Sequence, residues 1–337
     1  MQRELIQWYD KNKRDLPWRK TNDPYHIWIS EIMLQQTTVE AVIPYYLRFM
    51  KRFPNISTLA VADEEEVYKY WEGLGYYRRA KHILITAQII HQKYHDEFPQ
   101  DYKTILSLKG IGPYTAGAIS SIAFYKEVAA IDGNVLRIIS RTHLISDNIA
   151  LTKTQKKIEK IVNDLIKGYN PSSFNQGLMD LGARICRPIN PKCEECPIST
   201  YCEAYDKHQQ NVLPINIKNI KHKEIHYITA VISYKNTFLL VKNPAGLLEN
   251  LYGCIQYELD DPYQFIEKFK EEYQVELNVD AHIKDIKHIF THRTWIMHVY
   301  HFTLNQAISP MYTKKEMEKL PLSTAHMKVL NAYFKEN

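Results

Sequence analysis

The sequence predicts a multidomain protein in which an all-α domain is followed by an α+β domain. In the first part of the chain, apolar residues recur at helical spacing, as in segments 25–36, 76–94 and 134–145. From about Ile225 the pattern changes to short apolar runs that are typical of strands. A chain of 337 residues is long enough to form two domains, each with its own core.

The second domain combines strands with two helices. Apolar runs predict strands over 225–234, 237–241, 287–292 and 294–304, whereas 261–273 and 323–334 have helical spacing. The segment between the domains carries Pro214 and three lysines, which is typical of an exposed tether. We therefore expect a helical domain over 1–210, a linker over 211–224 and the α+β domain over 225–337. We expect the linker to be kept in water by Lys218, Lys221 and Lys223.

The composition predicts a folded protein, and the lack of a membrane span and of a secretory signal predicts a cytoplasmic one. Hydrophobic residues make up 45% and charged residues 24%, which argues against wholesale disorder and against collagen-like or coiled-coil architectures. No apolar run approaches the roughly 18 residues of a membrane span, and the N-terminus lacks the apolar region of a secretory signal. The net charge of +5 permits a polyanionic partner without requiring one.

Four of the five cysteines lie in one short stretch with the spacing C-x6-C-x2-C-x5-C, namely Cys186, Cys193, Cys196 and Cys202. In a reducing cytosol such a group favours metal binding over disulfides. Zinc sites usually pair two C-x2-C knuckles across a longer loop, so one compact run with uneven intervals favours an iron-sulfur cluster. A zinc site and four unrelated buried thiols are the alternatives.

The segment LKGIGPYTAGAI, residues 108–119, contains a turn with two glycines, Gly110 and Gly112. Pro113 stands where a helix can begin, so the turn would present backbone N–H groups to an anion at the helix N-terminus. This pattern suits a helix-hairpin-helix that grips DNA phosphate. An ordinary corner between two helices fits the same residues.

Two carboxylates stand in contrasting environments. Asp132 precedes the helical run 134–145, where an N-cap belongs, and helix N–H donors would depress its pKa and keep it ionised. Glu31 interrupts an apolar helical segment, so burial would raise its pKa and make it a proton donor near neutrality. The simpler interpretations are that Asp132 only caps its helix and that Glu31 lies at the surface. Together the two carboxylates match the pattern for breaking a glycosidic bond through an oxocarbenium-like transition state.

With SEIMLQQT around Glu31, GIGPYTAG, IDGNV around Asp132 and the four cysteines, the chain resembles the MutY family of adenine DNA glycosylases. This family belongs to the helix-hairpin-helix superfamily, and the resemblance covers roughly residues 3–206. It implies removal of adenine mispaired with 8-oxoguanine in double-stranded DNA, and a 4Fe–4S cluster as cofactor. We expect a monomer that is associated with the nucleoid, and replication or repair proteins as possible partners.

The resemblance also implies the roles of individual residues. Glu31 would protonate the adenine at N7, Asp132 would stabilise the cationic sugar, and Tyr114 and Asn134 would support these two carboxylates. Tyr76 would wedge into the base stack. The flipped adenine, or the gap that it leaves, would be surrounded by Arg19, Leu34, Gln35, Gln36 and Thr37. Bifunctional relatives carry a Schiff-base lysine at the position of Tyr114, so we expect a monofunctional glycosylase.

The C-terminal domain resembles the Nudix-like domain with which this family checks the base opposite adenine. The family's Phe-Ser-His loop corresponds to Phe290, Thr291 and His292, where threonine keeps the hydroxyl and adds a methyl group. Segment 265–276 lacks the full Nudix box, so pyrophosphatase activity is not expected. The simpler interpretation is that the Phe-Thr-His triplet is only the end of a strand beside Trp295.

Three other functions remain open at this point. A bifunctional glycosylase and AP lyase of the same superfamily is the principal alternative, and it would cleave the strand without alkali. A protein that binds damaged DNA without chemistry would not need Glu31. An iron-sulfur redox protein or a structural zinc protein would not bind DNA.

Overall fold

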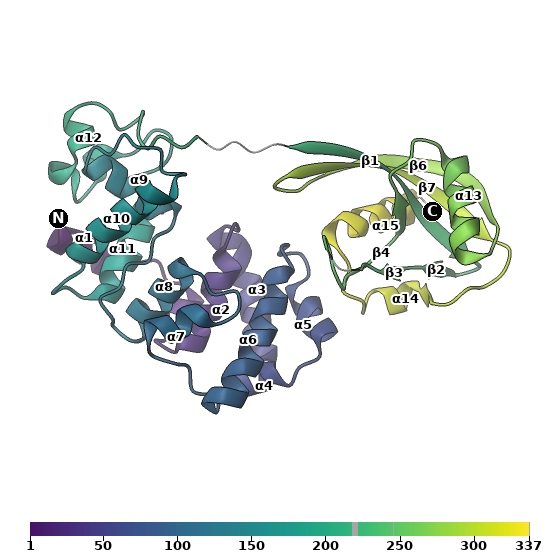
Figure 1. Ribbon diagram of the computed structural model, residues 1–337, viewed down its shortest axis with the longest axis horizontal. Helices are drawn as coiled ribbons and strands as arrows, with labels where there is room; N and C mark the ends of the chain where they lie inside the picture. The colour runs from purple at the N-terminus through teal and green to yellow at the C-terminus, as the bar shows by residue number, and fades with distance from the viewer. Residues whose placement is uncertain (218–221, 245, 337) are drawn as a thin grey trace. The chain divides into compact units, whose positions relative to one another are not determined.

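The computed structural model describes residues 1–217, 222–244 and 246–336 (Figure 1). The chain divides into two compact units, Met1–Val61 with His82–Lys218 and Ala62–Lys81 with Asn219–Asn337. We call the first the helical unit and the second the sheet unit. This division differs from the expected one because segment 62–81 groups with the C-terminal strands. In the described parts of the chain, no helix has both the length and the apolar character for crossing a membrane.

The helical unit contains only helices and connecting loops among its described residues. Its elements are α1 (Gln2–Asn12), η1 (Pro17–Arg19), α2 (Pro24–Leu34), α3 (Val39–Arg52), α4 (Ile56–Ala60), most of α6 (Arg78–Tyr94), α7 (Tyr102–Ser107), α8 (Pro113–Ala123), α9 (Gly133–Thr142), α10 (Thr152–Leu165), α11 (Pro171–Arg184), η2 (Cys193–Glu195), η3 (Ser199–Tyr201) and α12 (Glu203–Asp206). The predicted all-α fold of this part is confirmed.

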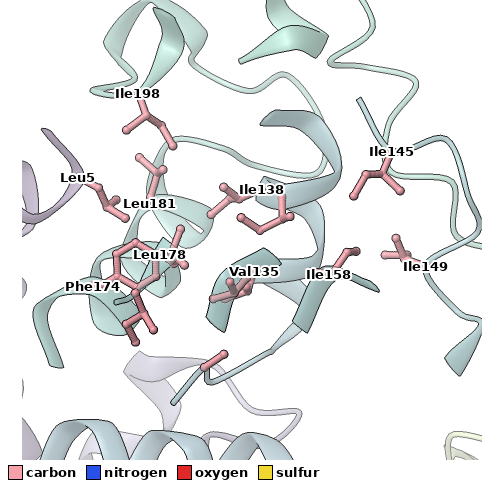
Figure 2. Close-up of a cluster of buried hydrophobic side chains, with 14 of the residues drawn as sticks. Leu5, Val135, Ile138, Ile145, Ile149, Ile158, Phe174, Leu178, Leu181 and Ile198 are labelled. Atoms are coloured by element: carbon pink, nitrogen blue, oxygen red, sulfur yellow. The ribbon is translucent and has the colours of Figure 1, made fainter. Parts of the chain in front are cut away.

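One apolar core joins α1, α9, α10 and α11 (Figure 2). Leu5 of α1, Val135 and Ile138 of α9, and Phe174 and Leu178 of α11 are all buried in it. Full burial of such a side chain contributes roughly 1.5–3 kcal/mol. The core therefore holds α9 firmly against α11, and this fixes the position of the first turn of α9.

Among the described residues of this unit, six helices begin at a side chain that caps them, among them α2, α9 and α11. Asp23 accepts a hydrogen bond from a backbone N–H of α2, Asp132 does so for α9, and Asn170 does so for α11. Each bond satisfies one of the N–H groups that have no partner inside the helix. The predicted N-cap at Asp132 is confirmed, and the helix start at Pro113 is confirmed as well.

The sheet unit is built on a six-stranded sheet with the order β6-β7-β1-β2-β8, in which β5 also pairs with β1. Its strands are β1 (Lys223–Tyr234), β2 (Thr237–Leu239), β5 (Ile255–Tyr257), β6 (Leu277–Ile289), β7 (Arg293–Leu304) and β8 (Met311–Thr313). The pair β1–β7 is parallel and the other pairs are antiparallel. A small second sheet pairs β3 (Val241–Lys242) with β4 (Tyr252–Gly253).

Helices cover both faces of the large sheet. Phe265 and Phe269 of α13 (Pro262–Tyr273) pack on one face, and Val329 and Leu330 of α15 (Thr324–Glu336) pack on the other. A short helix, α14 (Lys314–Met317), follows β8. The predicted α+β class and both predicted helices are confirmed. Strand β1 begins at Lys223, inside the expected linker, because that residue pairs with Arg293. Lys218 and Lys221 lie outside the described residues.

Segment 62–81, which contains α5 (Glu64–Trp71), belongs to the sheet unit through specific hydrogen bonds. Glu72 Oε1 accepts from the backbone N–H of Leu322 at 3.0 Å, and the hydroxyl of Tyr77 donates to the carbonyl of the same residue at 3.1 Å. Lys69 Nζ donates to the carbonyl of Leu320 at 3.1 Å. These partners are about 250 positions apart in the sequence, so local periodicity carries no sign of them.

Candidate active site

A cavity of about 920 Å³ lies in the helical unit. Residues from α2, α8, α9, η1 and α11 form its wall. Seven of the residues that the sequence singles out line it, namely Arg19, Glu31, Leu34, Thr37, Tyr114, Asp132 and Asn134. The two carboxylates therefore open into one cavity, although they are about 100 positions apart in the chain.

Glu31 is a buried acid in the middle of α2. Its residue is 5% exposed, and the hydroxyl of Tyr114 donates to its Oε2 at 2.5 Å. Burial raises the pKa of Glu31 to about 7, and the negative charge of Asp132 acts in the same direction. The hydrogen bond from Tyr114 and the charge of Arg19 oppose this shift. The predicted rise in pKa is confirmed, so the group can hold and release a proton near neutrality.

Asp132 accepts two hydrogen bonds at the start of α9. The backbone N–H of Val135 donates to Oδ1 at 2.8 Å, and Asn134 Nδ2 donates to Oδ2 at 2.7 Å. The predicted low pKa is nevertheless wrong, because burial raises the pKa of Asp132 more than these donors and the charge of Arg137 lower it. An anion in such a setting is poorly solvated, so a positive charge that develops beside it is strongly favoured.

Asn134 is held in place from two sides. Arg137 Nη2 donates to its Oδ1 at 2.8 Å, which orients the amide so that its nitrogen faces Asp132. On the other side the backbone of α11 passes so closely that a Cβ at Gly182 would lie 2.4 Å from the Asn134 Cβ. The absence of a side chain at position 182 is therefore required for this contact between α9 and α11.

Arg137 also connects this site to the cysteine loop. Its Nε donates to the carbonyl of Cys186 at 2.7 Å, and its Nη2 donates to the carbonyl of Gly182 at 2.9 Å. The sequence shows no coupling between the cysteines and the carboxylates, so this connection is a finding of the structure. The sequence did contain a signal for it, because Arg137 and Arg141 are cations four positions apart in an otherwise uncharged helix.

The four cysteines line one small apolar hollow, together with Ile138 and Ile198. Buried Arg141 fastens the loop: its Nη1 donates to Cys186 Sγ at 3.2 Å and to the carbonyl of Arg187 at 2.8 Å. In the described chain no three His, Cys, Asp or Glu side chains converge on one metal-ion position, whereas each cysteine of a four-iron cluster binds a different iron. Four thiols around an apolar hollow beside a buried cation fit such a cluster.

Sequence reasoning missed Asp180, which anchors Arg19, and Arg14, which shares that carboxylate. The carboxylate of Asp180, on α11, accepts Arg19 Nη1 at 2.8 Å and Nη2 at 2.9 Å, and it accepts Arg14 Nη2 at 2.6 Å. Burial opposes the ionised form of Asp180, but the hydrogen bonds and charges of both guanidinium groups outweigh it and hold its pKa below the usual value. The sequence did contain a sign of this site, because Asp180 is a carboxylate inside the apolar segment LMDLG.

Two other predicted groups of the helical unit are not among the residues that line the cavity. Gln35 Nε2 donates to Thr115 Oγ1 at 3.4 Å, and Gln36 has a left-handed backbone with φ 59°. Gly110, with φ 78°, and Gly112, the N-cap of α8, form the turn between α7 and α8. The predicted helix-hairpin-helix geometry is thus present, and no side chain caps the start of α8.

The remaining predicted residues lie in the sheet unit. Thr291 and His292 form the turn between β6 and β7, and the ring of Phe290 packs against Trp295 with centroids 4.7 Å apart. The hydroxyl groups of Thr291 and Tyr76 are hydrogen bonded at 2.7 Å. Tyr76 is 49% exposed and has a left-handed backbone with φ 50°. Within the sheet unit, therefore, the tyrosine of segment 62–81 and the Phe-Thr-His turn form one surface group.

Three protein-family models match the chain. The HhH-GPD superfamily of base excision DNA repair proteins matches residues 29–167, and a NUDIX domain matches 227–332. The iron-sulfur binding domain of endonuclease III matches residues 186–202, which begin and end at two of the four cysteines. This match and the donor set identify the four thiols as the ligands of a 4Fe–4S cluster.

Solved structures share the fold of the helical part. A thermostable thymine-DNA glycosylase is 32% identical with a TM-score of 0.56, and the alignment covers 61% of this chain and 94% of that one. A non-covalent complex of endonuclease III with DNA is 22% identical with a TM-score of 0.52, covering 62% and 94%. At that identity the second likeness concerns the fold alone.

Curated relatives match across both parts of the chain. The adenine DNA glycosylase of Arabidopsis thaliana is 38% identical over 289 residues, which are 74% of this chain and 46% of the plant protein. The adenine DNA glycosylase of Buchnera aphidicola subsp. Acyrthosiphon pisum is 38% identical over 297 residues. That alignment covers 88% of this chain and 83% of the relative. Identity at this level over most of both chains shows that the protein belongs to the adenine DNA glycosylase family of base excision repair.

Proposed function

We propose that this adenine-specific glycosylase hydrolyses the N-glycosidic bond of adenine that is mispaired with 8-oxoguanine or guanine in double-stranded DNA. The adenine is flipped out of the helix and enters the cavity of the helical unit. One observation carries this proposal: Glu31 and Asp132 open into the same cavity, and the pKa of Glu31 is raised to about 7. Extruding the base costs a few kcal/mol, which contacts in the cavity must offset.

Glu31 is the general acid of the proposed reaction. It protonates the adenine at N7, so that the electron pair of the breaking C1′–N9 bond leaves with a neutral base. With a pKa near 7, the group is substantially protonated at neutral pH and still acidic enough to release its proton. Tyr114 holds the carboxyl through its hydroxyl and fixes its direction.

Asp132 stabilises the cationic sugar that remains after the base has left. Its poorly solvated carboxylate gains most from a positive charge at C1′. Asn134 keeps one oxygen of the carboxylate in place, and the N–H of Val135 keeps the other. Water then adds at C1′ and releases a proton, which completes hydrolysis.

The enzyme is monofunctional in this proposal. A β-lyase needs an amine that forms a Schiff base with C1′, and the corresponding position beside Glu31 is occupied by the phenol of Tyr114. The alternative bifunctional reaction is distinguished by comparing strand scission of the product with and without alkali. Scission without alkali at the rate of base release would favour the lyase.

The Phe-Thr-His turn of the sheet unit reads the base opposite adenine. Thr291 and Tyr76 share a hydrogen bond on an exposed surface, so both hydroxyl groups are available to exchange that bond for contacts with a base. The cluster supplies a rigid framework for the loop 186–202 when it is bound. Arg141 and Arg137 connect this loop to α9.

The decisive test is Glu31→Gln, assayed for adenine release from a duplex with adenine opposite 8-oxoguanine while DNA binding is measured in parallel. Glutamine keeps the size and an acceptor oxygen but has no proton to give. We expect release to be lost and binding to be retained. Glu97→Gln, at an exposed position of the same unit, is the matched control and should behave like the wild type. Unchanged release by Glu31→Gln would overturn the proposed acid.

A further inference from the structure

Asp180 is a charged group that lies behind the wall of the cavity. Its side chain is 1% exposed, and two guanidinium groups converge on it from the N-terminal segment of the chain. Arg19 forms a two-bond fork with both carboxylate oxygens, whereas Arg14 donates to Oδ1 alone. Arg19 and Arg14 line the cavity, but Asp180 is not part of its lining.

The groups around Arg19 come from three helices and one loop. The Asp180 carboxylate, on α11, accepts hydrogen bonds from the Arg19 guanidinium. The centroid of the Tyr9 ring, on α1, lies 5.4 Å from the guanidinium carbon. The negative charge of Glu31, on α2, also acts on Arg19. Arg14 shares its carboxylate partner. A two-bond fork to one carboxylate fixes the plane of a guanidinium as well as its position.

The groups that face Glu31 come from three elements. They are the hydroxyl of Tyr114 on α8, the carboxylate of Asp132 at the start of α9, and the guanidinium of Arg19 in η1. Arg19 is the cation of this set, and its charge favours the ionised form of Glu31. The strength of that effect depends on where the Arg19 side chain is held and on how far its charge is neutralised.

We propose that Asp180 is a positioning residue of the glycosylase reaction, which holds and neutralises Arg19 so that this cation does not pair with Glu31. The proposal rests on the function proposed above for Glu31. Without the carboxylate at position 180, Arg19 becomes a buried cation without that counter-charge, and Glu31 is a carboxylate in the wall of the same cavity whose charge already acts on Arg19. An ion pair between them would leave Glu31 ionised, and an ionised Glu31 has no proton to transfer.

The test is the pH profile of single-turnover adenine release by Asp180→Asn. Release by the wild type falls as Glu31 loses its proton with rising pH, and the variant should show this fall at lower pH. For each enzyme, the rate at about pH 8 is divided by the rate on its low-pH plateau. This ratio should be about tenfold lower in the variant than in the wild type for each pH unit by which the midpoint of the fall moves down. A structural role alone would lower stability or the plateau and would leave the position of the fall unchanged.

Two further variants complete the design. Arg14→Met removes the other guanidinium but keeps the fork between Arg19 and Asp180, so its rate, relative to its own low-pH plateau, should fall at the same pH as that of the wild type. Asp180→Asn with Arg19→Met removes the unpaired cation, and its fall in rate should return to wild-type pH or higher. An undisplaced profile for Asp180→Asn, or no return in the double variant, would overturn the proposal.

The single variant Arg19→Met makes the proposal testable even where Asp180→Asn does not fold, as judged by circular dichroism and the cluster absorbance near about 410 nm. It leaves Asp180 paired with Arg14 and should displace the fall in rate to higher pH. No displacement would refute an influence of Arg19 on Glu31. Failure of the proposed acid is a different result, because Glu31→Gln would then release adenine like the wild type.

Discussion

Arg137 joins Asn134 to the cysteine loop: its Nη2 donates to the Asn134 side chain at 2.8 Å, and its Nε donates to the Cys186 carbonyl at 2.7 Å. Asn134 in turn donates to Asp132 at 2.7 Å. A continuous set of hydrogen bonds therefore connects the cluster-binding loop with the carboxylate proposed to stabilise the sugar cation. The loop can thus position that carboxylate without taking part in the chemistry.

Arg137→Met should slow adenine release more than it weakens DNA binding. The variant keeps the apolar stem but leaves the oxygens of Asn134, Gly182 and Cys186 without their donor, and the Asn134 amide loses its orientation. We expect the cluster absorbance near about 410 nm to persist, because the four cysteines are intact. Release and binding are measured together, with exposed Arg3→Met as control. Equal losses in both quantities would contradict a positioning role.

Gly182→Ala should reduce both stability and release. Its Cβ would lie 2.4 Å from the Asn134 Cβ, so α9 and α11 must move apart at the site, at a cost of about 1–3 kcal/mol. Gly177→Ala, on the same helix, meets the side chains of Leu5 and Tyr9 at 3.3 Å and serves as the control. It should lower stability less and leave release nearly unchanged. Urea unfolding and single-turnover release distinguish the two variants.

Asp132→Asn should strongly slow release without lowering stability. Asparagine caps a helix about as well as aspartate, so the start of α9 is retained. Loss of the negative charge removes the stabilisation of the sugar cation, which is worth roughly 100-fold or more in rate. Asp132→Ala loses the cap too and should cost about 1 kcal/mol of stability. Active Asp132→Asn enzyme would show that this carboxylate does not carry the proposed charge.

Glu31→Gln should stabilise the folded protein at alkaline pH. The folded state raises the pKa of Glu31 from its ordinary 4.5 to about 7, so it binds this proton more tightly than the unfolded state does. That stabilisation is complete below about pH 4.5 and is lost as the pH rises through about 7. The variant should therefore gain about 3 kcal/mol over the wild type near pH 8 and nothing near pH 4. Urea unfolding across this range checks the sign, and a difference independent of pH would refute it.

Thr291→Val should weaken the preference for 8-oxoguanine over guanine opposite adenine. Valine keeps the shape of threonine but removes the hydroxyl that is bonded to Tyr76. Thr291→Ser keeps the hydroxyl and loses only the methyl group, so its preference should remain. The measurement compares adenine release from duplexes that differ in the opposite base. Identical ratios for Thr291→Val and the wild type would exclude a reading role for this side chain.

The sequence alone was sufficient for features that depend on local pattern. Helical spacing around Glu31 predicts a buried acid, because apolar neighbours on most sides of one helix leave no solvated face. The position of Asp132 before an apolar run predicts its capping role, and the compact spacing of four cysteines predicts a cluster. Each of these signals lies within about one helix or one loop of the residue that it concerns.

Only the tertiary structure decided the features that depend on distant neighbours. Burial by other helices reverses the expected direction of the Asp132 pKa shift, although its hydrogen bonds within α9 are those expected. The hydrogen bonds between Arg19 and Asp180 join residues that are 161 positions apart in the sequence. The hydrogen bonds from segment 62–81 to Leu320 and Leu322 join residues that are about 250 positions apart. Desolvation and long-range pairing are set by which surfaces pack together, and a local sequence pattern contains no information about that.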